Sequence, residues 1–109
     1  MKARSLYGLL AGTLLAMGLT GVAAAAEHAV VIEKYNFSPT ELRIRKGDTV
    51  TWANNEKRVS HSVLFIGSGE ESERFLPGEK WSRVFPEAGR FEYRCGPHPE
   101  MLGVVIVED

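Results

Sequence analysis

The single cysteine of this chain lies in a short segment that also contains a histidine and a methionine. Cys95, His98 and Met101 are spaced three residues apart in Cys-Gly-Pro-His-Pro-Glu-Met. A thiolate and an imidazole are strong ligands for a soft metal such as copper, and a thioether is a weak axial ligand. A second imidazole would complete such a site, and His61, in Val-Ser-His-Ser-Val, is the candidate for it. The pattern therefore predicts a copper site.

Each of these residues also has an ordinary structural explanation when it is considered alone. A lone cysteine is most often a small buried hydrophobic residue, a Pro-His-Pro segment is often only a stiff turn, and a methionine near a final strand is usually part of a core. The spacing favours a metal, because otherwise four unrelated explanations would have to coincide. A purely structural zinc site is disfavoured, because a thioether is a poor zinc ligand.

The start of the chain has the three parts of a secretory signal peptide. Two basic residues are followed by an apolar stretch from residue 6 to about residue 19 and then by small residues up to Ala26. This order predicts a leader over residues 1–26 and a mature domain over residues 27–109, although cleavage after Ala25 fits almost as well. A retained membrane anchor is disfavoured, because the apolar stretch is shorter than the ~20 residues of a spanning helix.

The mature part is expected to form one small exported domain. Without its first 26 residues the chain has 83 residues, with 11 basic and 14 acidic side chains. This net charge of −3 gives no indication of nucleic-acid binding. In an oxidising compartment an unpaired cysteine is a liability, which metal binding removes. Besides the two candidate ligands the only histidine is His28, expected to be solvated near the new terminus, so no second copper centre or copper enzyme is predicted.

The mature region shows little helical periodicity and is predicted to be all-β. Short runs rich in β-branched and aromatic residues alternate with turn residues, which is typical of a sandwich. We expect an antiparallel Greek-key β-sandwich of seven to eight strands. Such a fold can bring His61, at the mouth of one strand, next to Cys95, at the end of another. The expected strands lie near 30–33, 42–45, 49–53, 62–66, 81–85, 91–95 and 103–107.

Two segments of the chain resemble a known family, the cupredoxins or small blue copper proteins. One is Phe-Ser-Pro-Thr-Glu-Leu-Arg-Ile-Arg-Lys-Gly-Asp-Thr-Val-Thr-Trp-Ala-Asn at residues 37–54, and the other is the segment from residue 87 to Met101 that ends in Cys-Gly-Pro-His-Pro-Glu-Met. Within the family, this short ligand loop is most similar to that of the amicyanins. The resemblance implies a trigonal copper plane made by His61, Cys95 and His98, with Met101 as the weak axial ligand.

The resemblance also implies a function and a docking surface. It implies a periplasmic monomer that shuttles single electrons between redox partner proteins through one Cu(I)/Cu(II) ion, without being an enzyme. Partners would dock at the exposed edge of His98, where Pro97, Pro99 and Leu102 are expected to gather. The alternative function is copper sequestration, delivery or tolerance.

The chain departs from the family next to two of the expected ligands. In relatives the first histidine is preceded by proline and followed by asparagine, whose side chain ties the two ligand loops together. Here Ser60 and Ser62 flank His61, and Gly96 follows Cys95. We expect this connection to be weakened or to be replaced, with the Ser62 hydroxyl as the candidate replacement. The acidic loop at residues 67–73 is expected to be exposed, either to keep the protein soluble or to steer a basic partner.

Overall fold

The computed structural model describes residues 24–109, so the expected leader lies outside the described residues except for its last three. This part of the chain contains eight strands and no helix, as the sequence predicts. None of the described residues form a helix with the length and apolarity needed to cross a bilayer. The strands are β1 (Glu27–Glu33), β2 (Asn36–Ser38), β3 (Glu41–Arg45), β4 (Thr49–Asn54), β5 (Leu64–Phe65), β6 (Lys80–Val84), β7 (Gly89–Arg94) and β8 (Leu102–Glu108).

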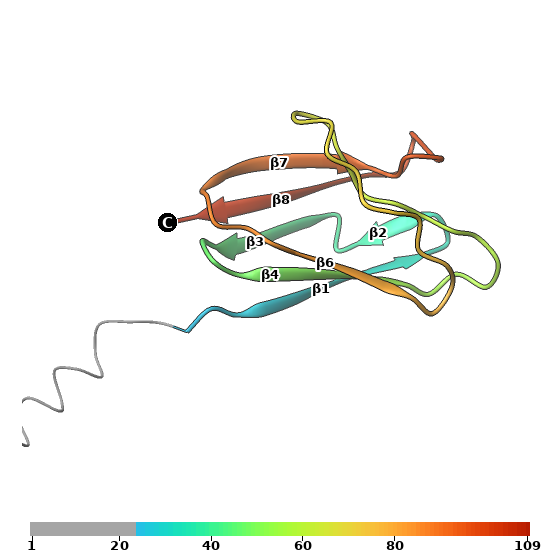
Figure 1. Cartoon of the computed structure of the whole chain (residues 1–109), viewed down its shortest axis with the longest axis horizontal. Helices are drawn as coiled ribbons and strands as arrows, with labels where there is room; N and C mark the ends of the chain where they lie inside the picture. Colours follow the sequence, from blue (N-terminus) through green and yellow to red (C-terminus); the bar gives the residue numbers. More distant parts are fainter. Residues whose placement is uncertain (1–23) are drawn as a thin grey trace, which may run out of the picture.

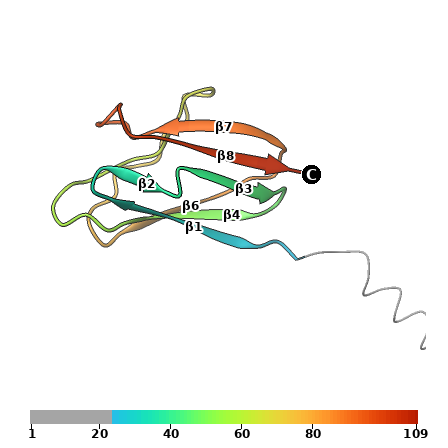
Figure 2. The same ribbon diagram turned by 180° about the vertical axis from the view of Figure 1, so that it is seen from behind.

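The strands form two four-stranded sheets that enclose the core between them (Figure 1 and Figure 2). One sheet has the order β2-β1-β4-β6 and the other the order β3-β8-β7-β5. β8 lies between β3 and β7, which explains why its sequence is apolar on both faces. The prediction of a β-sandwich is confirmed.

The expectation of antiparallel strands does not hold for two of the strand pairs. β1 pairs with β4 and β3 pairs with β8 in the parallel sense, so both sheets are mixed. The chain crosses from the first sheet to the second between β2 and β3. It does not reverse direction at this crossing, so β3 runs in the same direction as β2, which is opposite to β1. β4 therefore returns to the first sheet parallel to β1. Local alternation of residues cannot reveal such a crossing.

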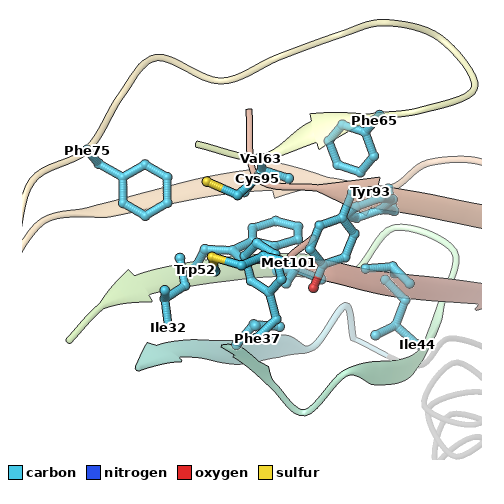
Figure 3. Close-up of a cluster of buried hydrophobic side chains, with 14 of the residues drawn as sticks. Ile32, Phe37, Ile44, Trp52, Val63, Phe65, Phe75, Tyr93, Cys95 and Met101 are labelled. Carbon is cyan, nitrogen blue, oxygen red and sulfur yellow. The ribbon is translucent and has the colours of Figure 1, made fainter. Parts of the chain in front are cut away.

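Large aromatic side chains fill the space between the sheets (Figure 3). β4 alternates strictly and buries Val50, Trp52 and Asn54 on its inner face. Trp52 packs edge-on against Tyr93 of β7, with ring centroids 5.4 Å apart. Tyr93 in turn lies so close to Gly103 that a Cβ atom there would overlap its ring. The aromatic core thus sets the position of β7 directly before the cysteine.

The predicted ligands lie at the end of the sandwich opposite the C-terminus (Figure 1). The segment 95–101 connects β7 to β8, and the segment 55–63 connects β4 to β5 at the same end. At the other end, His28 is only partly exposed and bonds to Asp48, so the expectation that it is solvated is wrong.

Candidate metal centre

The strand β7 carries Cys95 into the interior. Along β7, Tyr93 points inward, and the same alternation turns Cys95 inward immediately after the strand ends. Cys95 has no exposed surface. Its backbone N–H donates to the carbonyl of Met101 at 3.1 Å, and the N–H of Met101 donates to the carbonyl of His98 at 3.0 Å. These two bonds close the ligand loop on itself, so that its three candidate ligands share one compact turn.

His61 is held from a different part of the chain. It forms an isolated β-bridge with Phe75, in which each backbone N–H donates to the partner's carbonyl, at 3.2 Å and 2.9 Å. Its side chain is fully buried. The position of the ring is therefore determined by backbone pairing on one side and by core packing on the other.

The structure brings three of the predicted ligands together. The Nδ1 atoms of His61 and His98 each lie 3.4 Å from the Cys95 sulfur. All three donor atoms lie within 4.8 Å of one another, and no other group of this kind occurs in residues 24–109. One thiolate and two imidazoles are the donors that a soft, borderline metal such as copper prefers. The residues present therefore fit a copper ion.

The fourth predicted ligand, Met101, is buried next to this cluster. Its side chain is 2% exposed and contributes to the same core as Cys95, as Figure 3 shows. The backbone of Met101 is hydrogen-bonded both to Cys95 and to His98. Met101 is thus positioned near the site by the loop, and its role as a weak axial ligand stays a prediction.

Burial and hydrogen bonds shift the pKa values of two of the three candidate ligands. Burial raises the pKa of the Cys95 thiol, and hydrogen bonds from the backbone of Ser62 and His98 act in the opposite direction. Burial lowers the pKa of His61, although the hydrogen bond to Glu56 counteracts this effect. His61 is therefore a neutral ligand near pH 7. A bound metal deprotonates a coordinating thiol outright, so metal binding at this site would release the Cys95 proton.

Glu56 orients the imidazole of His61. Its Oε2 lies 2.9 Å from His61 Nε2 and accepts a hydrogen bond from the Tyr35 backbone N–H at 2.9 Å. Burial acts to raise the pKa of Glu56, but the hydrogen bonds from Tyr35 and His61 outweigh it, and the pKa is lowered overall. An ionised carboxylate at Nε2 leaves Nδ1 free to face Cys95, which is a common outer-shell arrangement for a metal-binding histidine.

Tyr35 covers the two imidazole rings from the β1–β2 turn. Its ring meets the ring of His61 at 5.9 Å and that of His98 at 5.0 Å, edge-on in both cases. Both Lys34 and Tyr35 have positive φ, at 53° and 60°, and this tight turn directs the tyrosine toward the site. The sequence alone did not indicate Tyr35 or Glu56, because only the fold brings them to the candidate ligands.

The expected tie between the two ligand segments is present and involves Ser62. The Ser62 hydroxyl accepts a hydrogen bond from the Gly96 N–H at 3.0 Å and donates one to Glu71 Oε2 at 2.8 Å. The prediction for Ser62 is therefore confirmed, and Glu71 is an additional member that the sequence did not indicate.

The predicted docking residues lie at the surface near His98. Leu102 is 57% exposed, Pro99 is exposed, and Pro97 and His98 are partly buried. Leu102 also lines a shallow groove with Ile66 on the outer face of the second sheet. Exposed apolar groups next to a ligand histidine are compatible with partner docking, which stays a prediction.

A two-sheet sandwich that holds one thiolate and two imidazoles at one end defines a cupredoxin site. Residues 24–108 match the family described as copper binding proteins, plastocyanin/azurin family, and the chain belongs to this family. The cofactor of this family is copper, in agreement with the donor set.

Individual relatives agree with the family assignment. The chain is 39% identical over 94 residues to amicyanin of Paracoccus denitrificans, which covers 79% of this chain and 70% of that protein. It is 34% identical over 85 residues to plastocyanin of Scenedesmus fuscus, which covers 66% and 86% of the two chains.

Solved structures show the same similarity. A purple cupredoxin from Nitrosopumilus maritimus superposes with a TM-score of 0.69 at 29% identity, covering 74% of this chain and 99% of that one. A reduced Cu(I) form of an amicyanin mutant superposes with a TM-score of 0.70 at 34% identity, covering 82% and 87%.

Proposed function

We propose that the protein is a type 1 copper protein that carries single electrons in the periplasm. The observation that carries this proposal is the convergence of the His61, Cys95 and His98 donor atoms on one buried point. His61, Cys95 and His98 would form the ligand plane and Met101 would be the weak axial ligand. Copper in such a site supplies a one-electron couple.

The protein's contribution is rigidity. His61 is held by its bridge to Phe75 and by Glu56, and Cys95 is held by the hydrogen bonds that close its loop. A site whose ligands are already fixed rearranges little when its charge changes by one electron. Fast transfer is therefore a better use of this geometry than metal storage, which benefits from ligands that can open.

Electrons would enter and leave at the His98 edge. The His98 ring is partly exposed, and Pro97, Pro99 and Leu102 offer the surface on which a redox partner would dock. We further propose that residues 1–26 are a leader that directs export and that the mature protein is a monomer without a membrane anchor. Amicyanin and plastocyanin, two of its relatives, support the role of a carrier rather than of an enzyme.

A spectroscopic titration tests the proposed function. Cu(II) is added to the purified mature protein, and the visible spectrum is followed through repeated cycles of reductant and oxidant. We expect an intense thiolate-to-copper band at one equivalent, which disappears on reduction and returns fully on oxidation. Tight Cu(I) binding without a reversible Cu(II) form would contradict the carrier and support copper sequestration or delivery. Met101→Leu should alter the band and the potential while copper stays bound.

A further inference from the structure

The loop at residues 67–73 packs back along the chain that follows His61. Glu71 forms an isolated bridge with Leu64, the Ser72 N–H donates to the Val63 carbonyl at 2.9 Å, and the Val63 N–H donates to the Ser72 hydroxyl at 2.9 Å. The loop is exposed as expected, except for Ser72, which is buried. These bonds fix the backbone of Glu71 next to the site.

The side chain of Glu71 completes a bridge between the two ligand-bearing segments. Ser62, directly after His61, is fully buried and uses its hydroxyl twice. The hydroxyl donates to Glu71 Oε2 at 2.8 Å and accepts from the N–H of Gly96, directly after Cys95, at 3.0 Å. The Ser62 hydroxyl thus uses its single O–H donor for Glu71 and one of its lone pairs for Gly96, which fixes the orientation of the hydroxyl. We refer to Ser62, Glu71 and Gly96 as the loop tie.

Gly96 is required for this arrangement. A Cβ atom at Gly96 would overlap the Glu71 carboxylate and would lie 2.6 Å from the Ser62 hydroxyl oxygen. Any other residue would therefore displace the carboxylate or the serine. Glycine at position 96 thus leaves room for the Glu71 carboxylate beside the Ser62 hydroxyl.

Glu71 also brings a negative charge to the ligand loop. Among the described residues Glu71 forms no ion pair. The Arg94 guanidinium, at the end of β7, donates to the carbonyls of Cys95 and Gly96 at 3.4 Å. A negative charge beside a metal centre favours the oxidation state with the higher positive charge, by an amount that solvent reduces for an exposed carboxylate.

We propose that Glu71 is a positioning residue of the copper site, which holds the Cys95 loop through Ser62 and lowers the reduction potential of the bound copper. The effect on the potential rests on the proposed function. The other part of the proposal, that the hydrogen bond between Ser62 and Gly96 holds the Cys95 loop, does not depend on the metal.

The test of the charge compares two substitutions in one loop. Glu71→Gln keeps an oxygen that can accept from Ser62 but removes the charge, and Glu73→Gln removes the same charge from an exposed neighbour as the matched control. The midpoint potential of the copper-loaded proteins is measured by spectroelectrochemistry. We expect Glu71→Gln to raise the potential severalfold more than Glu73→Gln does. Equal shifts would overturn the proposed role of the charge.

A double-mutant comparison tests whether Ser62 holds the carboxylate. If it does, Glu71→Gln will shift the potential less in a Ser62→Ala background than in the wild type, because the carboxylate is already released there. Shifts of the same size in both backgrounds would show that Glu71 acts without Ser62 and would overturn the coupling.

Hydrogen exchange of the metal-free protein tests the tie by itself. Ser62→Ala should speed exchange of the Gly96 amide at least about tenfold, corresponding to the loss of one hydrogen bond. Ser62→Thr should restore protection, and the Phe65 amide, which donates to the Glu70 carbonyl, serves as the internal reference. Unchanged Gly96 exchange would overturn the tie. If the wild type bound no copper, the proposed function and the effect on the potential would fail together, whereas this measurement would still decide the tie.

Discussion

The two ends of the sandwich each contain a histidine paired with a carboxylate at the same distance, but in residues 24–109 only one end brings together donors that could hold a metal. His61 Nε2 lies 2.9 Å from Glu56 at the loop end, and His28 Nε2 lies 2.9 Å from Asp48 at the opposite end. The difference is what else surrounds each pair. The second nitrogen of His61 faces a sulfur and another imidazole, while Asp48 receives backbone N–H groups.

The Asp48 end is built for stability. Asp48 accepts from the N–H groups of Ala26 and Arg45, at 2.9 Å and 3.1 Å, in addition to its contact with His28. Hydrogen bonds from Ala26, His28 and Arg45 lower the pKa of Asp48 from 3.8 to about 2. This carboxylate joins the start of β1 to the turn before β4. A histidine–carboxylate pair is therefore not a functional signal until its surroundings are known.

The largest expected effect is on the visible absorption of the copper-loaded protein, which should respond to a change at the loop end and not at the other end. Cys95→Ser should abolish the intense thiolate-to-copper band, because the chromophore requires the sulfur. His28→Ala, at the other end, should leave the band unchanged. Visible spectra with metal analysis check both variants. An intense band that survives in Cys95→Ser would mean that the chromophore lies elsewhere.

A smaller effect concerns the carboxylate that orients His61. Glu56→Ala should weaken copper binding by about 10-fold to 100-fold, the usual cost of removing an outer-shell partner of a metal ligand. Competition with a chelator of known affinity measures this change. His28→Ala is again the control, since its removal breaks a histidine–carboxylate pair of the same length without touching the site. Equal loss of affinity in both variants would contradict the distinction between the two ends.

The acid sensitivity of the metal-free protein should depend on Asp48. Because the folded-state pKa of Asp48 is below its ordinary value, its contribution to stability is present above the ordinary pKa of 3.8 and is lost as the pH falls toward about 2. Denaturant unfolding at a series of pH values should show this loss, and Asp48→Asn should flatten it. A pH profile that Asp48→Asn leaves unchanged would contradict this role of Asp48.

The smallest expected effect concerns the first residue of the mature chain. A protein that begins at Glu27 lacks the Ala26 N–H that donates to Asp48 and the Ala26 carbonyl that accepts from Thr49 at 3.0 Å. It should therefore unfold at a lower denaturant concentration than proteins that begin at Ala26 or Ala25, with an unchanged copper spectrum. Identical unfolding midpoints would show that these two bonds contribute nothing measurable.

The sequence alone predicts the chemistry of the site and the class of fold. Cys95, His98 and Met101 lie in one loop, so their proximity follows from chain connectivity, and His61 was the best candidate for the remaining imidazole. Seven of the eight strands were recognisable because alternation of buried and exposed residues is a local property. The three-residue strand β2, Asn36–Ser38, was missed, since it is too short to show such alternation. The bounds of the other seven differ by one to three residues, as for the strand expected at 62–66, which is reduced to β5, Leu64–Phe65.

The tertiary structure decided what surrounds those ligands. Tyr35, Glu56 and Glu71 lie in a turn, a connection and an acidic loop, and nothing in their local sequence shows that they contact the ligands or the ligand loop. The parallel pairing of β1 with β4 likewise depends on where the chain crosses between sheets. Ligand identity is a matter of residue type and spacing, whereas hydrogen bonds between residues distant in sequence arise only when the folded sheets bring their segments together.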